Sequence, residues 1–283
     1  MNVNNHRRKS ILCPNCNKLI SADEKACPYC GTVRPGSWWK GLGWTRVWAA
    51  PDRVIGLIIA VNVGMYVISL LLDLSRLGLS ANPLSLLSPS DRSLLLLGAT
   101  GTYPIDQFHH WWTLVSASYL HGGLLHILFN MMALRQIGAI VLAEYGAYRT
   151  FIVYTLTGIA GFLVSYVAGV SFTIGASASI SGLIGAALYY GKARGGVYGT
   201  YLYKQVLGWV IAIFLFGFLV PGINNWAHGG GLVSGICLGF LLAYQERRGE
   251  NLVHKGLAAV CALLTAGVLG WAVASSLWYR LLG

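Results

Sequence analysis

The sequence predicts an all-α protein that crosses a membrane several times and carries a small polar module at its N-terminus. Of its 283 residues, 55% are hydrophobic and only 10% are charged, and the mean hydropathy is +0.61. Ordinary soluble domains of this size do not have such a composition. Several of the ten Trp residues lie at the edges of apolar segments, where amphipathic rings favour the membrane interface. We therefore expect a multi-pass membrane protein.

The apolar residues fall into segments with lengths near the roughly 20 residues that a spanning helix needs. No repeat with a period of about 20 to 50 residues relates them to one another. We expect a six-helix core followed by a seventh helix. The predicted spans are residues 54–72, 124–143, 151–170, 177–191, 206–221, 227–244 and 256–278.

The basic residues predict an orientation for these helices. The net charge is +11, and Lys and Arg are concentrated in the N-terminal region and in the turns after the second, fourth and sixth segments. Positive residues stay on the cytoplasmic side, so we expect the N-terminus inside and the C-terminus outside, in the plasma membrane or a bacterial inner membrane. Orientation explains this charge without a nucleic-acid partner. The long loop over residues 73–110 is outside and partly apolar, and we expect it to lie half-sunk at the interface.

Four cysteines near the N-terminus have the spacing of a metal site. Cys13 and Cys16 form one CxxC pair, and Cys27 and Cys30 form another after ten intervening residues. Two such pairs bring four thiolates to a tetrahedral point, which predicts a structural Zn²⁺ as cofactor. Disulfides or redox chemistry are the alternatives, but the reducing cytosol favours thiolate ligation. We expect a zinc ribbon over residues 1–36 and a linker over 37–53, followed by the membrane domain over 54–280.

Polar residues gather at the first turns of three predicted helices. Because the second, fourth and sixth segments all enter from the outside, His121, His126, Asn130, Ser177 and His228 are expected in one layer below the outer surface. A hydroxyl in the first turn of a helix lies beside unsatisfied N–H groups and the positive end of the helix dipole. Polar side chains inside a membrane are costly and often functional. However, Ser also caps helices routinely.

Small residues follow both Ser177 and His228 at four-residue spacing. Such faces let two helices approach backbone to backbone, although they also occur in ordinary membrane packing. Here close approach would bring the serine and the histidine within hydrogen-bond reach. The small residues are Ala178, Gly182 and Ala186 in the fourth segment, and Gly231, Gly235 and Gly239 in the sixth.

Other hydrolytic sites can be eliminated. The acidic residues nearest the segments, Asp73, Glu144 and Glu246, all lie at segment ends, so no pair of carboxylates exists at depth for an aspartyl protease. The sequence has no HExxH motif for a zinc protease. No buried carboxylate completes a triad, which leaves a dyad of Ser177 and His228.

Three motifs in this order resemble the rhomboid family of intramembrane serine proteases. They are HGGLLHILFN (121–130), GASASISGLIGA (175–186) and NNWAHGGGLVSG (224–235). The resemblance covers roughly residues 54–280 and does not include the ribbon. It implies Ser177 as nucleophile and His228 as general base and then acid. It further implies that His126, Asn130 and the N–H of Ser177 form the oxyanion hole.

The chain departs from the family pattern at three positions. Ala178 stands where the family usually has Gly, which is a conservative change. Ser181 replaces an aromatic residue that would pack against the catalytic His, so we expect His228 to be held less firmly. Thr113 replaces an arginine after the tryptophan pair, and we expect a looser first loop.

The expected function is that of an intramembrane serine endopeptidase that cleaves transmembrane protein substrates near their outer end and needs no cofactor for catalysis. The alternative is a non-catalytic relative that binds or escorts transmembrane helices. A transporter or receptor is a third reading. The ribbon is either a docking module for a cytosolic partner or a structural lid on the N-terminus.

Overall fold

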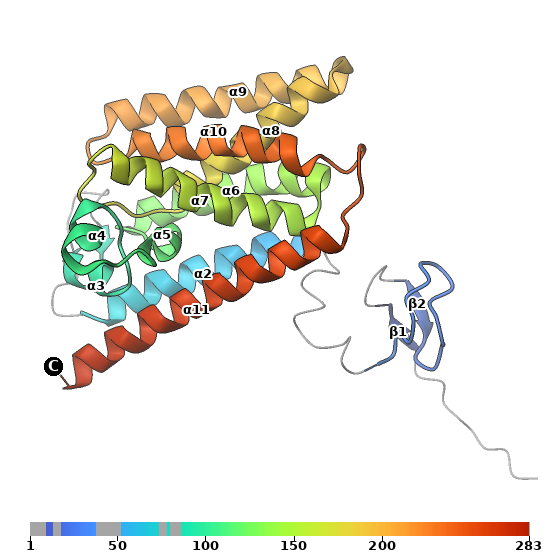
Figure 1. Cartoon of the computed structure of the whole chain (residues 1–283), viewed down its shortest axis with the longest axis horizontal. Coiled ribbons are helices and arrows are strands. Elements are labelled where there is room, and N and C mark those ends of the chain that lie inside the picture. The colour runs from blue at the N-terminus through green and yellow to red at the C-terminus, as the bar shows by residue number, and fades with distance from the viewer. Residues whose placement is uncertain (1–9, 14–17, 38–51, 74–77, 80–85, 283) are drawn as a thin grey trace, which may run out of the picture. The chain divides into compact units, whose positions relative to one another are not determined.

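The computed structural model describes residues 10–13, 18–37, 52–73, 78–79 and 86–282. The chain divides into two compact units, Met1–Leu57 and Ile58–Gly283, which are treated separately below (Figure 1). The predicted division at residues 36 and 53 stays a prediction.

The N-terminal unit contains a small antiparallel hairpin. Strand β1 (Ser10–Leu12) pairs with β2 (Leu19–Ser21) so that Ile11 lies opposite Ile20. The buried residues of this hairpin region are Cys13, Ile20 and Cys27. So small a core provides little hydrophobic stabilisation, and a unit of this size commonly depends on a bound metal.

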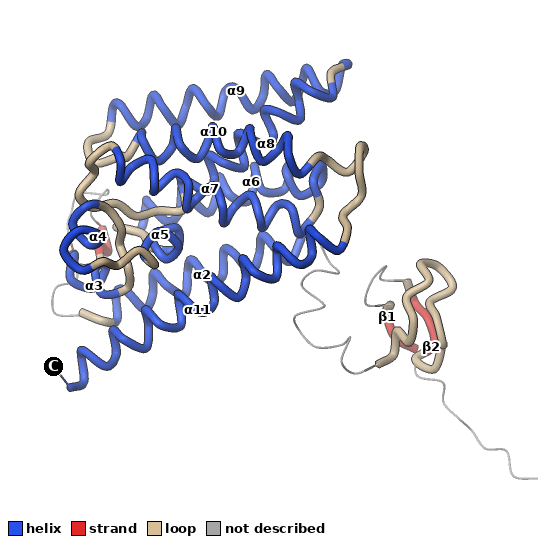
Figure 2. Tube along the Cα trace, in the orientation of Figure 1, coloured by secondary structure: helices blue, strands red, loops and turns tan. Residues whose placement is uncertain are grey.

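The membrane unit is predominantly helical, as the sequence predicts, and the helices are shown in blue in Figure 2. Within the described residues, α2, α6, α7, α9 and α11 are long and apolar enough to cross a membrane, which makes this an integral membrane protein. Helices α8 and α10 have 18 residues each and start with small and polar residues, which lowers their hydropathy. The long helices are α2 (Asp52–Leu71), α6 (Leu124–Tyr145), α7 (Ala147–Val167), α8 (Ser177–Arg194), α9 (Gly196–Leu219), α10 (Asn225–Leu242) and α11 (Leu252–Leu282).

Helices α2, α7, α9, α10 and α11 begin earlier than their apolar segments, and the starts of α7 and α9 follow glycine turns. Helix α9 starts at Gly196 rather than at 206, and α7 starts at Ala147 rather than at 151. The backbone breaks occur at Gly146, Gly195 and Gly196, which have φ of +87°, +65° and +66°. Glycine adopts this left-handed region without steric cost, whereas hydropathy detects only the apolar part of a helix.

The described part of the long first loop packs against the rest of the protein, while its position relative to the membrane interface stays a prediction. In this loop, strand β3 (Gly78–Leu79) pairs with β4 (Leu86–Ser88). Farther along the chain, the side chains of Leu94, Leu97 and Ile105 are buried. Their apolar character thus reflects packing against protein. The short helices here are α3 (Asp91–Leu96), α4 (Thr102–Phe108), α5 (Thr113–Ser116) and the 3₁₀ turn η4 (Ala117–Tyr119).

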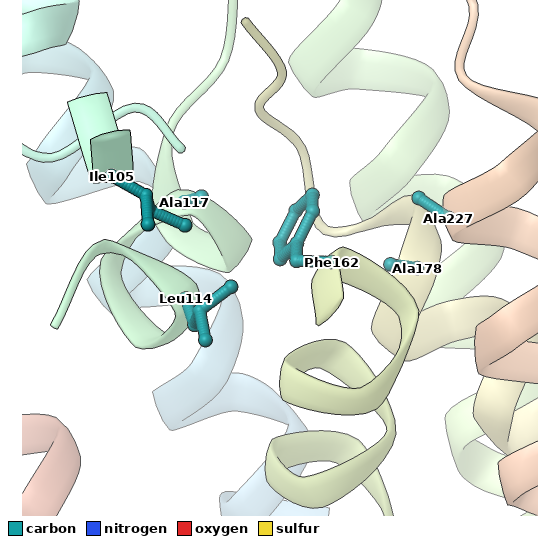
Figure 3. Packing of buried hydrophobic residues seen from close by; sticks show 6 residues of the cluster. All are labelled: Ile105, Leu114, Ala117, Phe162, Ala178 and Ala227. Carbon is teal, nitrogen blue, oxygen red and sulfur yellow. The ribbon is translucent and has the colours of Figure 1, made fainter. Parts of the chain in front are cut away.

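A hydrophobic cluster joins this loop to the starts of α8 and α10 (Figure 3). Phe162 of α7 lies between the loop residues and the alanines next to the candidate site. A backbone bridge between Thr100 and Thr173 adds a second connection. The loop therefore supports the first turn of α8. The cluster comprises Ile105, Leu114, Ala117, Phe162, Ala178 and Ala227.

Helix α8 packs against α10 with almost no space between the backbones. A Cβ atom added at Gly235 would overlap the carbonyl oxygen of Gly182, and one added at Gly231 would overlap that of Ala178. A Cβ atom added at Gly185 would likewise overlap the carbonyl oxygen of Leu232. Small residues therefore set the distance between the two helices.

We predict that Gly235→Ala lowers the free energy of unfolding by about 1–3 kcal/mol, because the added methyl group must push α8 away from α10. Thermal unfolding in detergent measures the effect. Gly208→Ala in α9 is the matched control, since a Cβ atom there meets nothing within 4 Å. Equal stability of the two variants would contradict the account of α8–α10 packing.

Candidate active site

Ser177 is the first residue of α8 and follows a constrained turn. Gly175 has φ of +127°, and its N–H donates to the carbonyl of Ala117 at 2.9 Å. The chain thus reaches α8 in a conformation that favours glycine. The N–H of Ser177 belongs to the first turn, where the helix itself supplies no acceptor.

His228 lies in the first turn of α10, which is capped by Asn224. The Asn224 side-chain oxygen accepts from Ala227 N at 3.1 Å, and its amide donates to Thr173 Oγ1 at 3.0 Å. The backbone N–H of His228 donates to the Asn224 carbonyl at 3.2 Å. Asn224 therefore ties the start of α10 to the segment that leads into α8. The sequence reasoning missed this residue, although Asn three positions before Ala227 is a recognisable N-cap signal.

The structure brings the two predicted dyad side chains together. His228 Nε2 lies 2.9 Å from Ser177 Oγ, which is within hydrogen-bond distance. The His228 side chain is buried, with 5% of its surface exposed. Its Nδ1 has no hydrogen-bond partner among the described residues. Within that part of the chain, no carboxylate is bonded to His228.

His126 directs a hydrogen-bond donor toward Ser177. Its Nδ1 accepts the N–H of Gly122 at 3.3 Å, so in the neutral ring the proton resides on Nε2. A Cβ atom placed on Gly175 would lie 2.9 Å from His126 Nε2 and 3.6 Å from Ser177 Oγ. The two side chains therefore face the same small space. Sequence reasoning did not single out Gly122, because the role depends on its backbone N–H.

Asn130 and His121 lie close to His126. The Asn130 amide donates to the His126 carbonyl at 2.8 Å, which is a bond within α6 and not toward Ser177. The His121 ring lies edge-on to the His126 ring, with 5.0 Å between the centroids. His121, His126 and Asn130 thus lie together, and the Asn130 amide retains a second N–H for another acceptor.

Thr113 is tied into the first loop. Its hydroxyl is buried and lies within hydrogen-bond distance of Thr100 Oγ1, at 2.9 Å, and of the His110 carbonyl. These contacts connect the residues after α3 with the turn before α5. These contacts do not test the expectation that the loop is looser without the arginine, which stays a prediction.

In the N-terminal unit, Cys13, Cys27 and Cys30 form a cluster that could hold a metal ion. Their sulfur atoms all lie within 4.8 Å of one another. The Sγ atoms of Cys13 and Cys30 are 3.7 Å apart, too far for a disulfide. Two thiolates on one tetrahedral zinc, at a Zn–S distance near 2.3 Å, would be roughly 3.8 Å apart. Cys16, the fourth predicted ligand, lies outside the described residues.

The fold and this geometry define a polytopic helical membrane protein with a buried serine–histidine pair. Residues 109–245 match the family model of the rhomboid domain. The chain is 31% identical over 223 residues to RHOMBOID-like protein 6, mitochondrial, of Arabidopsis thaliana. These aligned residues cover 73% of this chain and 72% of the relative. The chain thus belongs to the rhomboid family.

Two further relatives differ in the activity that their names state. Rhomboid protease GluP of Bacillus subtilis (strain 168) is 33% identical over 148 residues, which are 52% of this chain and 29% of that protein. Inactive RHOMBOID-like protein 8 of Arabidopsis thaliana is 29% identical over 227 residues, or 71% of this chain and 63% of the relative. Family membership alone therefore does not establish catalysis.

We predict that Gly175→Ala reduces labelling of Ser177 by a fluorophosphonate at least about tenfold, because the new methyl group would occupy the space that Ser177 and His126 share. Gly169→Ala is the matched control: Gly169 also has positive φ, of +81°, but a Cβ atom there meets nothing within 4 Å. Equal labelling rates in two folded variants would show that this space is not used.

Proposed function

We propose that this protein is an intramembrane serine endopeptidase that cleaves transmembrane segments of membrane proteins. The observation that carries the proposal is the 2.9 Å contact between Ser177 Oγ and His228 Nε2. Family membership supports it, since rhomboid relatives include a protein named as a protease.

In the proposed reaction, His228 Nε2 accepts the proton of Ser177 while Oγ attacks the substrate's peptide carbonyl carbon. The carbonyl oxygen becomes an oxyanion, which the Ser177 N–H and the His126 Nε2–H would stabilise. The second N–H of the Asn130 amide would contribute a further donor. His228 then gives its proton to the leaving amine, and the acyl-enzyme forms. Water, activated by His228, releases the second product and restores Ser177.

The site's depth determines which substrates it can accept. The site lies in the first turns of α8 and α10, so we propose that it cleaves near the outer end of a substrate helix, where small or helix-breaking residues allow the backbone to unwind. The charge distribution supports a cytoplasmic N-terminus and an external C-terminus in a plasma or bacterial inner membrane. No metal takes part in this chemistry.

A non-catalytic role in binding or escorting transmembrane helices is the second candidate. One relative is named inactive, and Ser181 stands where the family usually has an aromatic residue. The retained contact between Ser177 and His228 favours the protease.

We predict that the purified protein in liposomes cleaves members of a panel of single-span substrates, and that Ser177→Ala and His228→Ala each reduce kcat/KM at least about 10³-fold. Gel analysis and mass spectrometry of the products measure the rate and the cleavage site. Substrate that binds but remains intact with folded wild-type protein would favour the non-catalytic role instead.

We also propose that Cys13, Cys16, Cys27 and Cys30 bind one structural Zn²⁺ in a ribbon spanning residues 1–36. The separation of the three described sulfur atoms supports this assignment. The ribbon would dock a cytosolic partner or form a lid on the N-terminus.

We predict about one zinc per chain by elemental analysis, a large loss of zinc in Cys16→Ser, and unchanged zinc in the control Cys237→Ser, which changes a cysteine in α10 far along the chain. Cleavage in liposomes should be unaffected in both variants. Retention of full zinc by Cys16→Ser would contradict a four-cysteine site.

A further inference from the structure

Several buried polar atoms near the candidate dyad lack hydrogen-bond partners among the described residues, and two of them belong to residues at the contact between α8 and α10. These two atoms are Nδ1 of His228 and Oγ of Ser181. Both residues are almost fully buried, with 5% and 1% of their surfaces exposed. Buried polar atoms are normally bonded to protein or to an ordered water molecule. Each of these two atoms is therefore expected to have a hydrogen-bond partner other than a neighbouring protein atom, such as a water molecule.

Ser181 lies one turn of α8 further along the helix than Ser177. Ser181 follows Ser177 by four residues and lies on the same face of α8. Gly231 follows His228 by three residues on α10, and a Cβ atom added there would lie 3.3 Å from Ser181 Cβ. The contact between Ser177 and His228 thus forms one layer, and Ser181 against Gly231 forms the next. The Ser181 hydroxyl is the polar group of α8 in this second layer.

The ring chemistry of His228 requires a partner for Nδ1. For Nε2 to accept the Ser177 proton, the neutral ring must carry its own proton on Nδ1. A carboxylate performs this role in serine triads. Here Glu144 accepts from Tyr198, Glu246 pairs with Arg194 and Glu250 accepts from Arg149 N. All three lie at the opposite end of the helices and are not available to His228.

A serine at position 181 is too short to pack across the imidazole ring, so another interaction must orient the ring. A bridging water molecule needs at least two polar partners, which His228 Nδ1–H and Ser181 Oγ would provide. An aromatic side chain at this position would hold the imidazole by packing. A hydroxyl would hold it by hydrogen bonding, which also selects the tautomer.

We propose that Ser181 is a positioning residue that accepts the His228 Nδ1–H through one water molecule and so keeps Nε2 free to take the Ser177 proton. This inference rests on the proposed protease function. In this arrangement, the Ser181 hydroxyl and one water molecule orient the His228 ring, as the carboxylate does in a serine triad.

The first test is kinetic. Ser181→Ala should lower kcat about tenfold with KM unchanged, which corresponds to the loss of one neutral hydrogen bond. Ser179→Ala is the matched control, because its buried hydroxyl lies 3.4 Å from Ser118 Oγ and not toward His228. An unchanged kcat in Ser181→Ala, or the same loss in Ser179→Ala, would overturn the proposal.

The second test is spectroscopic and does not depend on turnover. In protein with ¹⁵N-labelled histidine, the His228 signals, identified by their absence in His228→Ala, should show the Nδ1–H tautomer in the wild type and a mixture in Ser181→Ala. A wild-type ring protonated on Nε2 would overturn the proposal, even if Ser181→Ala does not fold. Absence of cleavage by wild-type protein would instead count against the protease function, while the spectrum still tests the contact.

Discussion

The close approach of α8 and α10 is the constraint on which the candidate site depends. Ser177 and His228 are 51 residues apart in the chain, and their side chains are short. They meet because Gly231 and Gly235 allow the backbone of α10 to touch the carbonyls of Ala178 and Gly182. Larger side chains at these positions would separate the pair before any chemistry could occur.

Burying polar groups among membrane helices is energetically unfavourable, and hydrogen bonds at the helix ends compensate for part of this energy. Asn224 caps α10 and also bonds to Thr173 in the segment before α8. The backbone N–H of Gly122 donates a hydrogen bond to Nδ1 of His126. Apolar residues of the first loop pack against the starts of α8 and α10. The same contacts that satisfy polar atoms therefore also fix where Ser177, His126 and His228 lie.

Much of the fold could be predicted because it follows from composition. Long apolar segments require helices in a membrane, and the helical class and the family are confirmed. The starts of α7 and α9 were predicted too late, because glycine turns and not hydropathy set them. The burial of Leu94, Leu97 and Ile105 in the first loop was not predicted, because apolar residues in a sequence look alike whether they contact lipid or protein.

By itself, the sequence determined which residues could form a site: a serine and a histidine at helix starts, small residues behind them, and no carboxylate at depth. These follow from local periodicity and from the cost of burying charge. Only the tertiary structure decided that Nε2 of His228 contacts Ser177. The bonds from Gly122 to His126 and from Asn130 to His126 join residues four apart, but the side-chain conformations that make them were also visible only in the structure. Such contacts depend on side-chain rotation and on how closely distant segments pack, which local sequence patterns do not encode.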